Sequence, residues 1–266
     1  MRISLDVGAM MKSTDSAYYQ NVPRPIGAMS KAYASASVVP MHRHVRGQLI
    51  YAVSGVMEVI SSDYLWLVPP QRAVWMPPGV EHRMRARGDV SLRTLYIHPD
   101  VFPEDFSSFP RTVQVSGLLR ELILCAADIP VDYDVDGRDG RLMALLLEEI
   151  QWSPEQPLRL PSPRDQRLTR ICEAILANPG DDHGLEGWGK IVGASSRTLA
   201  RLFQAELGVS FRCWRQQARI LAALPRLAAG EPVTAIAADL GYETPGAFAS
   251  MFRRLTGAKP SQYFPH

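Results

Sequence analysis

Three histidines in the first third of this 266-residue chain have a spacing that could hold a metal ion. His42 and His44 are two positions apart, so in a β-strand, whose side chains alternate between faces, both imidazoles point to one side. Three imidazoles can fill most of the first coordination shell of Zn²⁺, Ni²⁺, Fe²⁺ or Mn²⁺. His42 and His44 are therefore candidate residues of a pocket for a metal or an effector. The alternative is that these imidazoles line a pocket or hydrogen-bond within the sheet without binding metal.

A second group of residues with evident chemistry is the set of arginines between Ser195 and Arg219. Five arginines lie in this stretch against one glutamate, Glu206, although the net charge of the whole chain is only +2. A local positive charge of this kind is typical of a surface that meets phosphate groups. The alternative is an ordinary solvated face, and the elements that carry the arginines decide between the two.

Two similar stretches of sequence would position these arginines. Each contains a short apolar helix, a glycine break, a capping hydroxyl residue and a second helix, which together are the pattern of a helix-turn-helix. The breaks are at Gly193 and Gly241, and the caps are Ser195 and Thr244. Apolar residues four positions apart share one face of each second helix, Leu199 with Phe203 and Phe248 with Phe252. Two such motifs in tandem indicate a DNA-binding domain.

The surface expected to face DNA consists of the remaining positions of the two second helices. In the first it comprises Ser196, Arg197, Ala200, Arg201 and Gln204, and in the second Thr244, Pro245, Gly246, Ala249, Ser250, Arg253 and Arg254. Arginine can donate two hydrogen bonds to O6 and N7 of guanine, whereas the small residues of the second helix can only follow the groove or touch a thymine methyl. We expect the first motif to specify sequence and the second to add affinity, with some of Arg212, Arg215 and Arg219 on phosphate.

Residues 165–264 resemble the DNA-binding domain of the AraC/XylS family of bacterial transcription regulators. The matching residues include Ser195, Leu199, Arg201, Phe203, Gly208, Ser210, Phe211, Ile236, Ala237, Gly241, Tyr242, Phe248, Phe252, Arg253, Gly257, Pro260 and Tyr263. The resemblance implies a sequence-specific transcription regulator, activator or repressor, with a double-stranded DNA operator and a small-molecule effector as partners. It also implies RNA polymerase as a partner of an activator, and it favours Arg197 and Arg201 as the residues that read bases.

The first part of the chain has the texture of an all-β domain, with short alternating runs separated by glycine and proline. Its His-x-His pair, followed by a histidine after Pro-x-Gly-x-x, resembles the cupin barrels that serve as sensors in many AraC-type regulators. In that fold the two segments are neighbouring strands whose imidazoles point into one cavity, so the resemblance implies a metal or effector pocket formed by His42, His44, Gln48 and His82. The cupin pattern usually has a glutamate where this chain has Gln48 and often an asparagine at Ala86. Because an amide oxygen is a weaker ligand than a carboxylate and does not neutralise a cation, a divalent metal remains one of two interpretations.

The expected fold class is α+β: an N-terminal cupin-like β-barrel with a helical hairpin, followed by an all-α domain with tandem helix-turn-helix motifs. The expected parts are a loose N-terminal arm at 1–25, the effector-sensing barrel at 26–110, the helical hairpin at 111–152, a Pro-rich linker outside any sheet at 153–163 and the DNA-binding domain at 164–266. Helices are expected at Ser116–Ala127 and Arg138–Trp152, and the resemblance makes this hairpin a homodimer interface.

Two local features run against the helical pattern. Gly187 and Gly189 lie in the first helix of the first motif, where each costs about 0.5–1 kcal/mol relative to alanine. Pro225 lies inside the helix that joins the two motifs and is expected to kink it or end it early.

Several classes of protein are disfavoured by composition. No apolar run reaches the roughly 18–20 residues of a membrane span, and no signal peptide is recognisable. The three cysteines have no metal-like spacing, which favours reduced thiols in a cytoplasmic protein. The expected function is that of a regulator rather than an enzyme. The alternatives are a metal-dependent cupin enzyme, of dioxygenase or isomerase type, with a helical appendage, and a regulator whose barrel serves only to dimerise.

Overall fold

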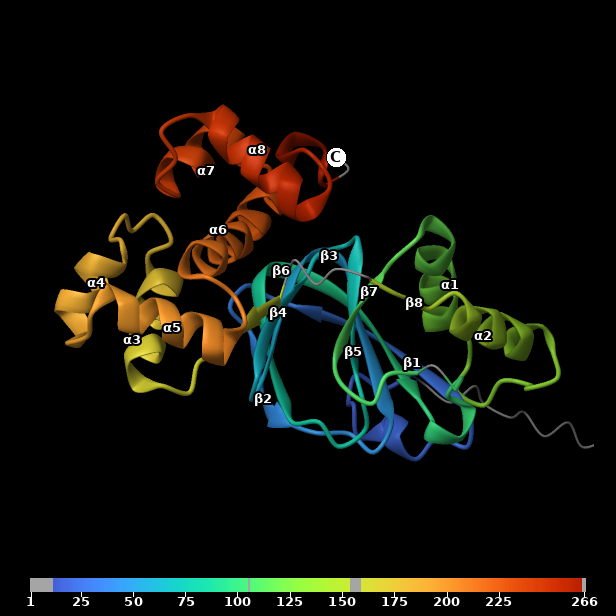
Figure 1. Ribbon diagram of the computed structural model, residues 1–266. Helices are drawn as coiled ribbons and strands as arrows, with labels where there is room; N and C mark the ends of the chain where they lie inside the picture. The colour runs from blue at the N-terminus through green and yellow to red at the C-terminus, as the bar shows by residue number, and fades with distance from the viewer. Residues whose placement is uncertain (1–11, 105, 154–158, 265–266) are drawn as a thin grey trace, which may run out of the picture.

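The structure, a computed structural model, describes residues 12–104, 106–153 and 159–264. A bent β-sheet occupies the middle of the molecule, with a pair of helices at one end and a larger group of helices at the other (Figure 1). This α+β arrangement is the one predicted from the sequence. Among the described helices, none is both long and apolar enough to cross a membrane.

Within the described residues, nine strands form one antiparallel sheet organised around two long strands, β3 (Gly47–Ser61) and β6 (His82–Ile97). They pair along their length, from Gly47 opposite Ile97 to Ser61 opposite His82, with register shifts on either side of Ser54. Gly55 has φ +74°, and a Cβ there would collide with the carbonyl oxygen of Asp89. Only glycine fits this irregularity, which is the kind of bulge at which long strands bend.

The two halves of the long strands belong to two layers. One layer adds β1 (Ile26–Tyr33), β5 (Arg72–Met76), β7 (Arg111–Gln114) and β8 (Gln151–Trp152). The other adds β2 (Val38–His42), β4 (Tyr64–Val68) and β9 (Arg159–Pro161). Among the described residues the sheet runs from β1 to β8 without pairing these two ends, so the predicted cupin-like domain is a folded open sheet and not a closed barrel.

Strand alternation sorts the core of this sheet into two clusters. Leu49 and Tyr51 of β3 face the helical pair, whereas Ile50 and Ala52 face the space between the two layers. The inner space is filled by apolar side chains that include Val59, Trp66, Val74, Met76 and Met84. Because both faces of β3 are buried here, its sequence is a continuous apolar run and does not alternate between apolar and polar residues.

The helical pair consists of α1 (Gly117–Asp128) and α2 (Arg138–Glu148). The Ser116 hydroxyl caps α1 by accepting a hydrogen bond from the Leu119 amide at 3.0 Å. The two predicted helices are therefore present, but α2 ends at Glu148, and Trp152 lies instead in β8, paired with Val113. Leu118 and Leu145 keep 51% and 40% of their surface exposed on this pair.

The segment before β1 packs closely against the sheet over the residues that the structure describes. A short 3-10 helix, η1 (Tyr18–Gln20), buries Tyr19 completely. The buried Arg46 guanidinium donates hydrogen bonds to the carbonyls of Gln20, Val22 and Arg24, which ties this segment down. The prediction of a loose arm is therefore wrong for residues 12–25, and residues 1–11 lie outside the described residues.

The Pro-rich segment also joins the sheet in part. β9 pairs with β4, with Pro161 opposite Tyr64, at an edge position where a missing N–H is tolerated. The predicted extended backbone is found there, but the prediction that this segment stays outside the sheet was wrong. Residues 154–158 of the predicted linker are outside the described part of the chain.

The C-terminal domain is all helical. Its helices are α3 (Gln166–Ala177), α4 (Leu185–Val192), α5 (Ser196–Leu207), α6 (Phe211–Ala228), α7 (Val233–Asp239) and α8 (Pro245–Thr256), followed by η3 (Pro260–Gln262). α6 continues past Pro225, so an early end at this residue was a wrong prediction. Leu224 and Leu227 on either side are buried in the core, which holds the last turn in place.

The helical core extends into the sheet domain. Val56, Leu67 and Leu160 belong to the same apolar cluster as the residues of α3 and α6. The Trp214 indole N–H donates to the Pro161 carbonyl at 3.2 Å, and the Gln71 side-chain amide donates to the carbonyl of Tyr263. The two domains therefore share one packed boundary.

Candidate functional sites

The first helix-turn-helix is formed by α4 and α5. α4 ends at Gly193, whose φ of +70° is the left-handed conformation that glycine adopts without strain. The Ser195 hydroxyl then caps α5 by accepting from the Thr198 amide at 3.1 Å. Leu199 and Phe203 are fully buried, as their spacing predicts. The turn glycine, the hydroxyl cap and the two buried apolar residues form the frame of this motif, and all of them were predicted from its sequence.

Gly189 has a structural reason that the sequence did not reveal. A Cβ at this position would collide with the carbonyl oxygen of Ala194, in the turn that joins α4 to α5. The absence of a side chain at Gly189 therefore permits the close approach of the turn to α4, at a cost in helix propensity. At Gly187 a Cβ would meet only the movable ring of His183, at 2.9 Å.

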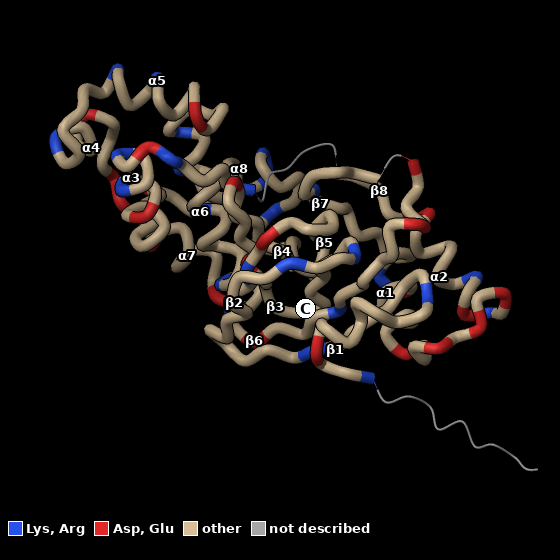
Figure 2. The backbone as a smooth tube through the Cα atoms, turned by 90° about the horizontal axis from the view of Figure 1, so that it is seen from below, with Lys and Arg blue, Asp and Glu red and all other residues tan. Residues whose placement is uncertain are grey.

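The opposite face of α5 is open to solvent. The predicted contact residues on this face, Ser196, Arg197, Ala200, Arg201 and Gln204, are all exposed. Arg197 and Arg201 are four residues apart and so occupy neighbouring positions on one side of the helix. Basic positions along α5 lie on the part of the helical domain away from the sheet (Figure 2). This face is therefore available to enter a groove of DNA.

The second helix-turn-helix repeats the frame with α7 and α8. Gly241 has φ +72° in the turn, and the Thr244 hydroxyl accepts from the Ala247 amide at 3.2 Å. Pro245 occupies the first turn of α8, where its missing N–H has no helical partner to lose. The outward residues Thr244, Pro245, Gly246, Ser250, Arg253 and Arg254 are exposed, and Ala249 is half-buried. The Arg254 guanidinium donates to the Gln216 side chain at 3.0 Å.

Two of the arginines of α6 make hydrogen bonds to backbone carbonyls within the domain. Arg219 is only 8% exposed, donates to the carbonyls of Pro179 and Asp181 at 2.9 and 3.2 Å, and lies over the Tyr242 ring. Arg215 donates to the His183 carbonyl, and burial lowers its pKa. The expectation of a phosphate contact is wrong for Arg219, because its guanidinium is used to hold the loop before α4. Arg212 is exposed.

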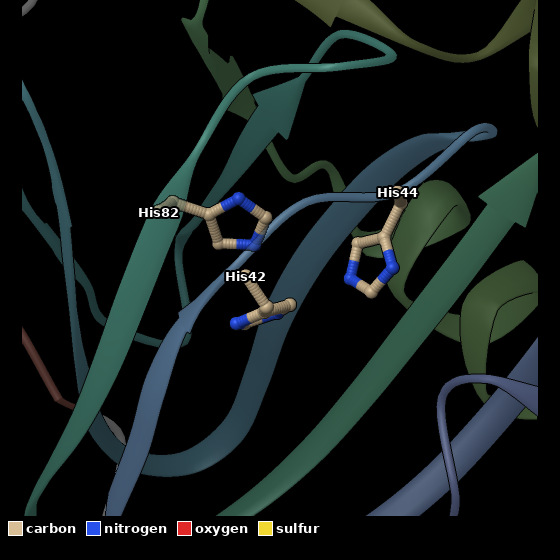
Figure 3. A group of neighbouring side chains, drawn as sticks. All are labelled: His42, His44 and His82. Atoms are coloured by element: carbon tan, nitrogen blue, oxygen red, sulfur yellow. The ribbon is translucent and has the colours of Figure 1, made fainter.

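The structure brings the three histidines of the sheet domain together. His42 ends β2 and lies opposite His82, the first residue of β6, while His44 follows in the loop after β2. One ring nitrogen of each residue lies within 4.8 Å of the other two, and the rings face one another (Figure 3). His44 and His82 are buried, and His42 is half-buried.

Hydrogen bonds fix the orientation of two of these rings. Nδ1 of His42 lies 2.7 Å from the Pro40 carbonyl oxygen, and Nδ1 of His82 lies 3.0 Å from that of Val80. A carbonyl only accepts, so each Nδ1 carries the proton and each Nε2 keeps its lone pair. The Nε2 atoms of His44 and His82 are buried, and neither has a hydrogen-bond partner among the described residues.

Both buried imidazoles are neutral at neutral pH. Burial, followed by the charges of His42 and His82, lowers the pKa of His44 to about 3. Burial also lowers the pKa of His82 to about 4, against the opposing effect of its hydrogen bond to Val80. Neutral imidazole is the form that binds a metal ion.

Gln48 lies in the same part of the sheet and is 1% exposed. Its side-chain nitrogen lies 3.4 Å from the Tyr96 hydroxyl, and the Tyr96 ring is 5.1 Å from that of His44. Its Oε1 finds no hydrogen-bond partner within the residues described. Tyr96 was missed by the sequence analysis, because only the register of β3 against β6 places it opposite Gln48.

A cleft of about 640 Å³ is lined in part by residues next in sequence to two of the histidines, although none of the three histidines lines it. Met41 precedes His42, and Val80 and Glu81 precede His82. The other lining residues are Ser61, Ser62, Asp63, Tyr64, Ser108, Phe109, Pro110 and Arg159. A volume of this size accommodates a small organic molecule.

Comparison with known proteins matches both parts of the chain. Residues 28–138 match the family model of the AraC-like ligand binding domain, and residues 188–265 match a helix-turn-helix domain. The HTH-type transcriptional regulator NimR of Escherichia coli (strain K12) is 36% identical over 224 residues, which cover 84% of this chain and 81% of that protein. The arabinose operon regulatory protein of Salmonella typhimurium (strain LT2) is 25% identical over 216 residues, covering 73% and 74% of the two chains.

Proposed function

This chain belongs to the AraC family of transcriptional regulators, and we propose that it is a cytoplasmic homodimer that reads its operator mainly through α5. It binds DNA with its tandem helix-turn-helix motifs and carries a ligand-binding domain, as members of the family do. The relatives compared above are named as regulators, so the enzyme alternative gains no support from them.

The observation that carries the proposal is the contrast between the outward faces of α5 and α8. α5 presents the exposed long donors Arg197 and Arg201, each able to make a bidentate contact with guanine. α8 presents small side chains at Pro245, Gly246 and Ser250, which cannot. In α8 the exposed Arg253 and Arg254, near its C-terminal end, are suited to phosphate contacts that add affinity without specificity.

The test is a binding-site selection with the full-length protein on random duplexes. Sequence information is expected to concentrate in the half of the site that lies under α5, with a weaker and A/T- or shape-based preference under α8. Fluorescence anisotropy on the selected duplex is expected to fall steeply with salt, because phosphate contacts release counterions. Equal information in both halves of the site would contradict this division of roles.

For the effector, the proposed pocket is the region of His42, His44, Gln48 and His82 together with the cleft beside it. The boundary shared by the sheet domain and α3 and α6 gives a direct route by which a ligand could bias the placement of α5. Of the expected division at 1–25, 26–110, 111–152, 153–163 and 164–266, we keep 164–266 as the DNA-binding domain, whereas residues 12–25 and the strands β7, β8 and β9 extend the sheet domain beyond 26–110. As an activator, the function favoured by the family, it would also contact RNA polymerase.

For the dimer, the proposed interface is the helical pair α1–α2. Leu118 and Leu145 are exposed there, on helices that project from the sheet on the side away from the DNA-binding domain (Figure 1). Sedimentation velocity is expected to show a dimer that Leu118→Glu weakens at least tenfold. Ile191→Glu, at an exposed apolar position on α4, is the matched control and is expected to leave the dimer intact.

A further inference from the structure

The chemistry of the histidine site can be specified beyond the proposed function. We infer that His42, His44 and His82 bind one divalent transition metal ion in the sheet domain, and that the effector is an anionic small molecule with an apolar body that completes the coordination of this ion. The second half of the inference rests on the proposed function, whereas the metal site stands without it.

The geometry fits a single ion. Nitrogen ligands at about 2.0–2.1 Å from one ion lie up to roughly 4 Å apart, and the three candidate nitrogens here all lie within 4.8 Å of one another. His42 and His82 are held opposite each other by strand register, with their Nδ1 atoms bound to backbone carbonyls. His44 lies in a loop, so a small movement of that loop closes the remaining distance. Backbone-anchored imidazoles of this kind are typical of metal ligands.

Two buried nitrogen atoms point to the same conclusion. Nε2 of His44 and Nε2 of His82 are buried ring nitrogens for which the described part of the chain supplies no hydrogen-bond partner. A buried polar atom without a partner is destabilising, and a folded protein normally satisfies it with protein, water or an ion. Because both rings lie in one cluster with the His42 ring, a single cation bound by the three rings would satisfy them together.

The donor types select the metal. Three neutral imidazoles suit Zn²⁺, Co²⁺, Ni²⁺ or Fe²⁺, whereas Mg²⁺ and Ca²⁺ prefer carboxylate and carbonyl oxygen.

The charge of the site determines the class of effector. The imidazoles bring no negative charge. The buried Gln48, whose side-chain nitrogen lies 3.4 Å from the hydroxyl of Tyr96 next to His44, offers an amide oxygen instead of a carboxylate. The +2 charge of the ion is then uncompensated by its protein ligands, so an anionic oxygen ligand gains from both coordination and charge. Glu81, at the cleft wall, is exposed to solvent, where its charge is screened.

The surroundings determine the body of the effector. The space between the two layers is filled by the cluster that contains Met76 and Met84, so the body of the ligand is assigned to the cleft lined by the residues next to His42 and His82. There the cleft carries Met41 and Phe109, whose side chains are 52% and 61% exposed. Aromatic or aliphatic carboxylates combine the anionic group and the apolar body that such a site would bind.

The first experiment titrates tag-free, chelator-treated full-length protein with Co²⁺ and follows the visible absorption of the bound ion. One Co²⁺ per chain is expected, with elemental analysis as a second measure of stoichiometry. His44→Ala and His82→Ala are expected to weaken Co²⁺ binding at least tenfold. His183→Ala, which removes an exposed histidine of the DNA-binding domain, is the matched control and is expected to leave it unchanged. No Co²⁺ binding in the wild type, or binding that persists in both cluster variants, overturns the metal site.

The second experiment adds acetate and benzoate to the Co²⁺-loaded protein. Both are expected to shift the Co²⁺ absorption bands, benzoate at a lower concentration because of its apolar ring. Gln48→Glu, which supplies the missing carboxylate without deleting a ligand, is expected to bind Co²⁺ more tightly and to respond less to either anion. Unchanged bands in the wild type, or an undiminished response in Gln48→Glu, overturn the anionic effector.

Anisotropy measurements on the selected DNA duplex, made with the same preparations, separate this inference from the proposed function. Intact DNA binding by wild-type protein that takes up no Co²⁺ overturns the metal site and leaves the regulator standing. Stoichiometric Co²⁺ uptake by protein that does not bind the duplex supports the metal site and refutes the proposed reading of DNA.

Discussion

The two helix-turn-helix motifs have the same frame but different outward faces. Each has a glycine with positive φ in its turn, a hydroxyl cap on its second helix and two fully buried apolar residues four positions apart. Outside this frame, α5 carries exposed arginines near its start, whereas α8 begins with Pro245 and Gly246. Packing therefore imposes the same buried side on both second helices, whereas their solvent-exposed sides carry different residues.

The largest effect is expected from breaking the frame, and it should be the same in both motifs. Phe203→Ala and Phe252→Ala each remove a fully buried ring and are expected to lower the free energy of unfolding by about 3–5 kcal/mol. Urea unfolding followed by tryptophan fluorescence measures this loss. Arg201→Ala is the surface control and is expected to stay within about 0.5 kcal/mol of the wild type. A large loss in only one motif would show that the two frames are not equivalent.

The next effect separates the outward faces. Arg201→Ala is expected to weaken binding to the selected duplex by about 1–3 kcal/mol and to relax the preference for one base pair, because a bidentate contact is lost. Anisotropy titrations on the selected duplex and its single-base variants measure both changes. Arg170→Ala, an exposed arginine of α3 outside both motifs, is the matched control. A uniform loss of affinity across all duplexes would assign Arg201 to phosphate instead.

A smaller effect is expected at the caps. Ser195→Ala and Thr244→Ala each leave an amide without its hydroxyl partner and are expected to cost about 1 kcal/mol of stability. Thermal unfolding compares the two variants, and Ser195→Thr keeps the hydroxyl as a control. Since both caps bond the amide three residues on, a much larger loss at one of them would break the symmetry of the frames.

The smallest effect is expected at the end of α8. Arg254→Ala removes an exposed charge suited to phosphate and is expected to reduce the salt dependence of binding by about one counterion, with sequence preference unchanged. Affinity measured over a salt series gives the slope. A change of base preference in this variant would mean that α8 reads sequence as α5 does.

Features that depend on residues close together along the chain could be predicted from the sequence, whereas contacts between residues far apart along the chain could not. The two motifs and their buried pairs depend on residues within a few turns of each other. The convergence of His42 and His44 was expected from strand alternation, but β2 ends at His42, so the loop after it, and not the strand, positions His44. Arg219 was misjudged because its carbonyl partners, at Pro179 and Asp181, lie far back in the chain.

The errors in the sheet domain have the same origin. The segment at 12–25 is held by Arg46, and nothing local to that segment predicts the contact. The open sheet depends on how β3 and β6 bend near Gly55, which alternation within a single strand does not encode. The pairing of Gln48 with Tyr96 likewise becomes visible only once the register of these two strands is known.

The shared boundary between the sheet and the helical domain bears on the layout of the operator. Because Val56, Leu67 and Leu160 are part of the helical core, the orientation of α5 relative to the sheet is set by this packing, and a ligand changes it only by shifting the boundary. In a dimer, the α5 helices of the two protomers meet the same side of a duplex only when the half-sites are separated by whole helical turns, about 10–10.5 base pairs each. Five extra base pairs between the half-sites would turn one α5 helix away from its groove, whereas ten would restore the alignment of the half-sites.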